Sequence, residues 1–232
     1  MTPDAANSIE TSDLKKRYGS GPDSTFALRG VNMTVKRGEY ISISGPSGSG
    51  KSTLLNMLGA LDRPTSGRVV LDGEDISKLS SADLARIRNS KVGFVFQDFN
   101  LISRMSTVEN VELPLSISGV PPKLRRRRAM SLLNGFGIAE KASRSPRELS
   151  GGQRQRVAVA RALANNPSII LADEPTGNLD SENARLTMEF LEELNTRFGK
   201  TLLIVTHDLE AAARADRTVM IRDGVVERIV EN

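Results

Sequence analysis

A chain of 232 residues, 38% hydrophobic and 26% charged, is long enough for one folded domain, or one domain with a lobe. It has no cysteine and a single histidine, which excludes disulfides, thiolate metal sites and zinc sites of the usual type. The formal net charge of +4 is mildly basic, and no apolar run approaches the roughly 18 residues of a membrane span. No secretory signal is visible at the N-terminus, and the absence of cysteine fits a reducing cytoplasm.

The first part of the chain alternates strand patterns with turns. Residues 1–8 are expected to form a loose tail, and Gly19–Ser24 a turn-rich loop. Asp72-Gly73 is a hairpin signal. The patterns predict a helix over 51–60 and strands over 31–35, 40–44, 67–71 and 92–96.

From about residue 98 to 150 the character of the sequence changes. Prolines punctuate short helical patterns and β-branched runs vanish, which predicts a helical subdomain inserted into the sheet domain. One of its helices begins with Arg125–Arg128. Four consecutive helical positions wrap most of the way round the axis, so we interpret these arginines as a solvated first turn. A lipid-headgroup contact is the alternative.

The last part of the chain alternates helices with apolar strands. The patterns predict helices over 150–164 and 181–197, strands over 168–172 and 202–206, and then a short helix and a final β segment. Fully apolar strands that alternate with helices indicate a parallel sheet covered on both faces. The predicted fold class is therefore α/β.

Residues Gly45–Ser52 fit the phosphate-loop pattern G-x-x-x-x-G-K-[ST], between a predicted strand and a predicted helix. Backbone N–H groups of such a loop cradle the β- and γ-phosphates, with Lys51 between them and the Ser52 hydroxyl on Mg²⁺. The flanking strand and helix argue against an ordinary glycine turn. The residues expected to bind the nucleotide here are Gly45, Pro46, Ser47, Gly48, Ser49, Gly50, Lys51, Ser52 and Thr53.

Polar residues stand at the tips of three other predicted strands. Asp173 and Glu174 follow a buried strand, at the strand end where α/β proteins bind ligands. We assign Asp173 to the metal and Glu174 to the general base. His207 is expected to contact the γ-phosphate or to position the attacking water, and Gln97 to reach Mg²⁺ or water. Taken singly, Asp173-Glu174 is more readily a polar strand end, a lone histidine is usually structural, and Gln97 is as readily a surface glutamine. The phosphate loop favours the functional interpretation.

Leu149–Gln153 combines a helix start with two glycines. Ser150 and Gln153 fit the capping box, in which two side chains satisfy each other's backbone donors. Each glycine costs about 1 kcal/mol relative to alanine in a helix. Because a bare backbone at a helix N-terminus allows close approach of an anion, Ser150, Gly151, Gly152 and Gln153 are predicted to contact a phosphate.

Tyr18 is expected to lie in a loop before the first long strand, where an adenine can stack on it; a surface or core aromatic is the alternative. Together these elements resemble the nucleotide-binding subunit of an ATP-binding-cassette (ABC) transporter over essentially the whole chain. Residues 94–101 and 109–115 are similar to the branch of lipoprotein-release, macrolide-export and cell-division ATPases. The motifs run in the family's order: Tyr18, 45–52, Gln97, 149–153, Asp173-Glu174, 178–180 and His207.

The resemblance implies a single ABC ATPase domain over 1–232. It would have a P-loop NTPase core with a mostly parallel sheet, an N-terminal antiparallel β subdomain and a helical subdomain inserted at about 98–150. The implied cofactors are ATP and Mg²⁺. The implied catalytic residues are Glu174, His207, Lys51 and Gln97, and the implied metal ligands are Ser52, Gln97 and Asp173.

The resemblance also implies partners. The segment 149–153 would contact the ATP held by the phosphate loop of a second copy, with two chains packed head to tail around two ATPs and Asp180 at their interface. Gln97 would lie at the hinge between the lobes. The dimer would drive a separate integral membrane permease from the inner face of the cell membrane. An ATP-switched regulator without transport, and a cassette acting on nucleic acid, are the alternatives; the short spacing from Lys51 to Asp173 leaves no room for the long coiled coil of the latter.

Overall fold

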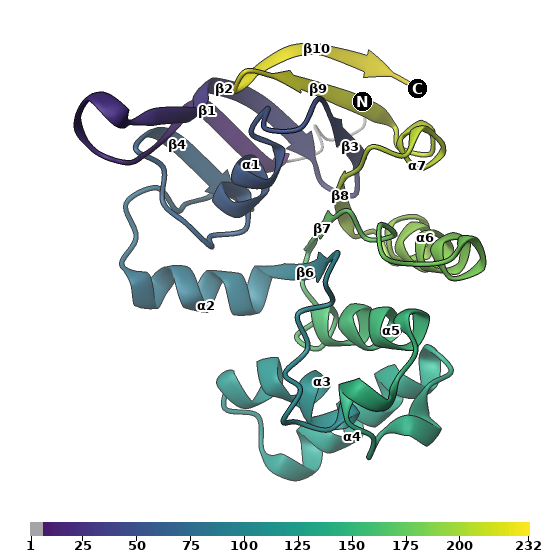
Figure 1. The fold of residues 1–232 in the computed structure, drawn as a ribbon. Coiled ribbons are helices and arrows are strands. Elements are labelled where there is room, and N and C mark those ends of the chain that lie inside the picture. The colour runs from purple at the N-terminus through teal and green to yellow at the C-terminus, as the bar shows by residue number, and fades with distance from the viewer. Residues whose placement is uncertain (1–6) are drawn as a thin grey trace, which may run out of the picture.

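A six-stranded sheet forms the centre of the computed structural model, which describes residues 7–232 (Figure 1). Its strand order is β10-β9-β3-β8-β7-β6. All neighbours are parallel except β10, which pairs antiparallel with β9. The strands span β3 Tyr40–Ser44, β6 Val92–Phe96, β7 Ile169–Asp173, β8 Thr201–Val205, β9 Arg217–Arg222 and β10 Val225–Glu231. The predicted α/β fold with a mostly parallel sheet is confirmed.

A second, antiparallel sheet has the order β2-β1-β4-β5. It consists of β1 Asn7–Tyr18, β2 Thr25–Lys36, β4 Ser66–Leu71 and β5 Glu74–Asp75. Asn7 and Ser8 begin β1, so they do not belong to a loose tail; the rest of the predicted tail lies outside the described residues. Irregular register, with Asp13 at φ 44°, breaks the period-2 pattern that would have revealed β1. Tyr18 ends this strand, paired with Thr25, and does not lie in a loop.

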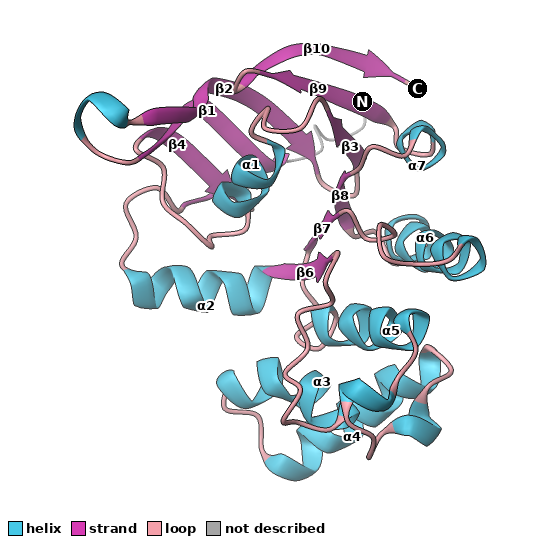
Figure 2. Ribbon diagram, viewed as in Figure 1, coloured by secondary structure: helices cyan, strands magenta, loops and turns pink. Residues whose placement is uncertain are grey.

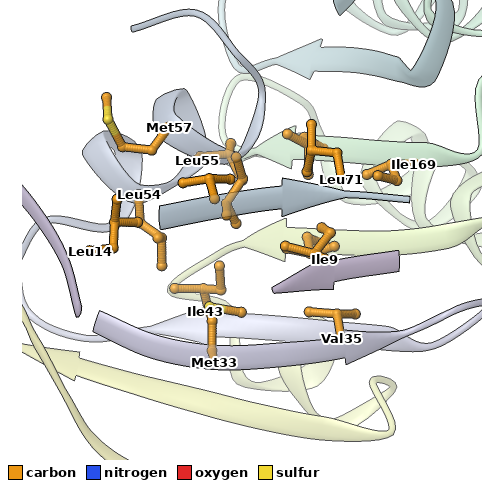
Figure 3. Packing of buried hydrophobic residues seen from close by; sticks show 14 of the residues in the cluster. Ile9, Leu14, Met33, Val35, Ile43, Leu54, Leu55, Met57, Leu71 and Ile169 are labelled. Carbon is orange, nitrogen blue, oxygen red and sulfur yellow. The ribbon is translucent and has the colours of Figure 1, made fainter. Parts of the chain in front are cut away.

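One hydrophobic core joins the two sheets through α1 (Lys51–Leu58), as Figure 3 shows. Leu54 and Leu55 of α1 pack among Ile9, Ile43 and Leu71, one from each of three strands. Because the two sheets bury their apolar faces against the same helix, the loop that precedes α1 has a rigid base. α2 (Ser81–Lys91), which the sequence patterns did not predict, runs directly into β6.

The opposite face of the six-stranded sheet packs on α5 (Gly151–Ala162), α6 (Ser181–Thr196) and α7 (Leu209–Ala213). A third cluster of buried residues lies among α3 (Thr107–Ile117), α4 (Pro122–Gly135) and α5. Figure 2 shows α3 and α4 away from the strands, with α5 between them and the sheet. The turns η2 (Ala139–Lys141) and η3 (Pro146–Glu148) belong to the same segment of the chain. Another turn, η1 (Gly21–Asp23), joins β1 to β2. No helix within residues 7–232 is long and apolar enough to cross a membrane.

Candidate functional site

The loop between β3 and α1 presents bare backbone at a helix start. Gly45, Gly48 and Gly50 have φ of 150°, 76° and 104°, which side chains rarely adopt. A Cβ on Gly45 would overlap the carbonyl oxygen of Ile221, and one on Gly50 would overlap that of Ala27. Gly50 is the N-cap and provides no side-chain cap, so the first N–H groups of α1 remain open to an anion.

Lys51 closes this loop in the structure. Its Nζ donates hydrogen bonds to the carbonyl oxygens of Gly45 and Pro46, each at 2.9 Å. The ammonium group therefore lies over the concave backbone of the loop. A phosphate bound there would meet a positive charge together with the backbone donors, as the sequence predicted for Lys51.

The loop opens into a cavity of about 330 Å³ at the tips of β7 and β8. Most of its lining comes from residues predicted for the site. Ala27 of β2 and Val205 of β8 are additions that carry no sequence signal, because only the packing of the two sheets brings them to the loop. The lining residues are Ala27, Ser47, Gly48, Gly50, Lys51, Ser52, Thr53, Asp173, Glu174 and Val205.

Ser52 and Asp173 face each other in this cavity. The Ser52 hydroxyl donates to Asp173 Oδ1 at 3.4 Å. Burial raises the pKa of Asp173, the neighbouring Glu174 carboxylate adds to the rise, and Ser52 and Lys51 oppose it. A hydroxyl and a partly desolvated carboxylate beside a phosphate loop are a suitable donor set for Mg²⁺, whose charge would offset the cost of burying Asp173.

Glu174 and His207 form a hydrogen-bonded pair at the same edge. His207 Nδ1 lies 2.9 Å from Glu174 Oε1, and the Glu174 side chain is 18% exposed against 78% for His207. The hydrogen bond to Glu174 raises the pKa of His207. Glu174 has φ 45°, and its N–H donates to Val205 O at 2.9 Å. The chain direction after β7 is thus tied to β8, which directs the carboxylate into the cavity.

Gln97 directly follows β6, whose last residue, Phe96, pairs with Asp173 in the register of the sheet. Its side chain lies against Gly177, where an added Cβ would be 2.8 Å from Gln97 Nε2, and not against the phosphate loop. Asn178 Nδ2 donates to Gln97 O at 3.2 Å and to Asp98 Oδ1 at 2.8 Å. The sequence did not predict that Asn178 attaches residues 176–180 to the end of β6.

Tyr18 lies next to the first turns of α1. Its hydroxyl donates to Asp62 Oδ2 at 3.1 Å, and the side chain is 44% exposed. Partial burial and the Asp62 carboxylate raise the pKa of Tyr18, while Thr53 opposes the rise. The hydroxyl is therefore anchored in its neutral form. Lys16 Nζ lies over the ring, 4.9 Å from its centroid, and the part of the ring that stays exposed is suitable for stacking on a base.

The predicted capping box at the start of α5 is confirmed. Ser150 Oγ accepts from Gln153 N at 3.3 Å, and Gln153 Oε1 accepts from Ser150 N at 3.0 Å. A Cβ on Gly152 would overlap the side chain of Asn183, which is held by Asp180, the N-cap of α6. Gly152 thus has a packing reason to be glycine. None of the residues that line the phosphate cavity comes from this helix start.

The α/β fold and the phosphate loop define a nucleotide-binding protein. Similarity to known proteins identifies its family. The sequence matches the ABC transporter family over residues 28–177. It is 52% identical over 221 residues to an uncharacterized ABC transporter ATP-binding protein of Thermotoga maritima, covering 95% of this chain and 94% of that protein. It is 50% identical to the macrolide export ATP-binding/permease protein MacB of Syntrophobacter fumaroxidans, covering 94% of this chain but 31% of MacB.

Among solved structures, the chain is similar to a dimeric, post-hydrolysis state of the ATP-binding cassette MJ0796 bound to ADP and Pi. The TM-score is 0.90 at 46% identity, over 96% of this chain and 98% of that one. The protein named MJ0796 is from Methanocaldococcus jannaschii. The chain belongs to the ABC transporter family of ATP-binding cassettes, and its function is that of an ATP hydrolase serving a transporter. The predicted family and its macrolide-export branch are confirmed.

Proposed function

We propose that two copies of this chain close head to tail around two ATPs and drive a membrane permease. One observation carries this proposal. The phosphate cavity is lined within one chain, whereas the glycine-bearing start of α5 lies outside it and still presents a helix N-terminus. A second copy can supply the phosphate that this helix start faces. The dimeric MJ0796 cassette structures support such an assembly.

Within each cavity we assign the roles by position. Gly45–Thr53 hold the phosphates, with Lys51 between them, and Tyr18 stacks on the base. Ser52 and Asp173 hold Mg²⁺, and Gln97 joins them when its side chain turns from Gly177. When bound, Mg²⁺ neutralises charge that develops on the phosphate oxygens. Glu174 takes a proton from the attacking water and His207 orients it.

Across the interface, Ser150–Gln153 of one copy contact the γ-phosphate of the ATP in the other, and Asp180 lies beside them. Ser150 is the N-cap of α5 and Asp180 is the N-cap of α6. The two helix starts are adjacent, since Asn183 of α6 packs on Gly152 of α5. Hydrogen bonds to charged groups contribute about 1.5–3 kcal/mol each, so a few across two ATPs suffice to close the dimer. Hydrolysis of ATP removes some of these hydrogen bonds, and the dimer opens.

The permease partner is inferred from relatives. MacB combines an ATP-binding part with a permease in one chain, and this chain matches 31% of it. The Thermotoga maritima relative, by contrast, is matched over 94% of its length, which supports a permease on a separate polypeptide. We therefore place the protein on the inner face of the cell membrane, as one ABC ATPase domain over 1–232 with its helical subdomain at about 98–150. No nucleic acid is expected as a partner.

Glu174→Gln tests the proposal. The amide cannot take a proton but keeps the shape of the site, so hydrolysis should fall by about 100-fold or more while ATP binding persists. Gel filtration should then show more dimer with ATP than with ADP. If ATP gave no more dimer than ADP, the two-ATP assembly would be wrong.

A further inference from the structure

The chain makes a strained turn immediately after Gln97. Phe99 and Asn100 both have left-handed backbone, with φ of 61° and 47°. Asn tolerates this region, but Phe rarely adopts it, and two such residues in succession persist only where the surroundings hold them. We call residues 97–100 the Gln97 turn. Its conformation decides where the Gln97 side chain lies.

Arg161 of α5 holds the carbonyl side of this turn. Its Nη2 donates to Phe99 O at 2.9 Å and its Nη1 donates to Asn100 O. Burial alone lowers the pKa of Arg161 to about 10, so the guanidinium stays charged at neutral pH. One planar guanidinium group thus donates hydrogen bonds to the backbone carbonyls of both strained residues.

Arg154 of the same helix holds the side chain of the turn. Its guanidinium lies over the Phe99 ring, 5.1 Å from the centroid, and Phe99 is only 8% exposed. Arg154 Nε is buried without a hydrogen-bond partner in the described part of the chain, while the guanidinium group lies over the aromatic face of Phe99. Arg154 and Arg161 are seven residues apart, about two helical turns, and therefore lie on one face of α5.

The other side of the turn is held by Asn178, through Gln97 O and Asp98 Oδ1. The hydrogen bonds from Arg161 and Asn178 go to backbone oxygens of the turn and to Asp98, and none goes to the Gln97 side chain, which is exposed. The helix that carries the arginines begins at Ser150. A shift of α5 would consequently be transmitted to Gln97 through both guanidinium groups.

We propose that Arg161 and Arg154 are positioning residues that place Gln97 for hydrolysis by holding the Gln97 turn in its left-handed conformation. This inference rests on the proposed function, in which Gln97 reaches Mg²⁺ or the attacking water. Arg161 has the larger effect on the position of Gln97, because it binds the backbone of both strained residues. Arg154 has the smaller effect, because it contacts only the Phe99 ring.

The test begins with Arg161→Met in the full chain. Single-turnover ATP hydrolysis should fall by about 10- to 100-fold, the scale of a misplaced reacting group. The Mg²⁺ concentration for half-maximal hydrolysis should rise, while the Kd for a fluorescent ATP analogue stays within about twofold, because the phosphate loop is untouched. Arg156→Met is the matched control, a half-buried arginine on α5 outside these contacts, and should change none of the three.

Two further variants keep the test decisive if Arg161→Met folds poorly. Arg154→Leu removes only the stacking and should lower hydrolysis by about threefold. Asn100→Gly, added to Arg161→Met, should restore part of the rate and of the Mg²⁺ dependence, since glycine adopts positive φ more readily than asparagine does. A purely structural arginine would lower the melting temperature and leave the Mg²⁺ dependence of the remaining activity unchanged, which would overturn the proposal.

Gln97→Ala separates this inference from the proposed function. If Gln97→Ala leaves hydrolysis and Mg²⁺ dependence unchanged, the proposed role of Gln97 is wrong and the positioning role falls with it. If Gln97→Ala slows hydrolysis but Arg161→Met does not, only the positioning role is wrong. If both slow it, the double variant should be no slower than Gln97→Ala alone, because both act through one side chain. Fully additive losses would contradict the proposal.

Discussion

The chain contains two glycine-rich helix starts, and they differ in how their backbone donors are used. At the start of α1, three glycines have positive φ and Gly50 leaves the first N–H groups uncapped. At the start of α5, Gly151 and Gly152 have helical backbone, and Ser150 and Gln153 cap each other. The first start is a concave phosphate loop completed by Lys51. The second is a helix start whose N-cap and N3 residues already satisfy each other's backbone donors.

The start of α1 is therefore a complete phosphate-binding site within one chain. The start of α5 is half of a site, which needs the phosphate held by another molecule. The loop at α1 has within the same chain a cation, a hydroxyl and two carboxylates around a cavity. None of the residues that line this cavity comes from the start of α5, and Gly152 is explained by its contact with Asn183. A Cβ on Gly151 would make only ordinary van der Waals contacts, so packing does not explain this glycine. Its bare backbone is therefore the part of the helix start that a ligand can approach. An anion at α5 would have to be brought by another molecule.

The largest expected effect is at the phosphate loop. Gly45→Ala should weaken binding of an ATP analogue by about 100-fold or more, because the new Cβ would meet the backbone oxygen of Ile221 at a φ that favours glycine. Gly151→Ala, in helical backbone, should leave the Kd of the isolated chain within about twofold. Fluorescence titration measures both. Equal losses in the two variants would contradict the division into a site and half a site.

A smaller effect is expected at the packing between α5 and α6. Gly152→Ala should lower the free energy of unfolding by about 1–2 kcal/mol, because Asn183 must leave its hydrogen bonds with Asp180. Adding Asn183→Ala should remove the overlap and make the Gly152→Ala change nearly neutral. Gly151→Ala should be neutral or stabilising by up to about 1 kcal/mol. Urea unfolding of the set decides whether Gly152 is a packing residue.

The smallest effect concerns protonation of His207. Because Glu174 stabilises the imidazolium, the pKa of His207 should lie above 6.5, and Glu174→Gln should lower it. The stabilisation from this pair is present below the unfolded pKa and is lost as the pH rises through the folded pKa. His207 is the chain's only histidine, so NMR titration of the untagged protein gives one assignable imidazole. Identical midpoints in both proteins would show that the pair does not form in solution.

The sequence predicted those features that depend on residues close together in the chain. The phosphate loop was visible because strand, glycines, Lys51 and helix are contiguous. Asp173, Glu174 and His207 were visible because they lie at or just after the ends of buried strands. β1 was missed because its bulges remove the alternation. α2 was missed because only Leu84 and Ile87 of its eleven residues are buried.

Long-range contacts were outside the reach of the sequence. Nothing near Gly152 reveals that Asn183 packs on it, and nothing near Phe99 reveals the two arginines of α5. Ala27 reaches the phosphate cavity only because β2 packs beside the loop. In each case the partner lies tens of residues away and neither residue type is unusual for a surface or a core. These are the contacts that connect one part of the site to another.

The central claim is that the start of α5 binds the ATP of a second copy. Analytical ultracentrifugation of Glu174→Gln with ATP should show a dimer, and adding Ser150→Arg should leave a monomer that binds an ATP analogue with unchanged Kd, since Ser150 lies outside the phosphate cavity. A Glu174→Gln/Ser150→Arg protein that still dimerised with ATP would contradict the account.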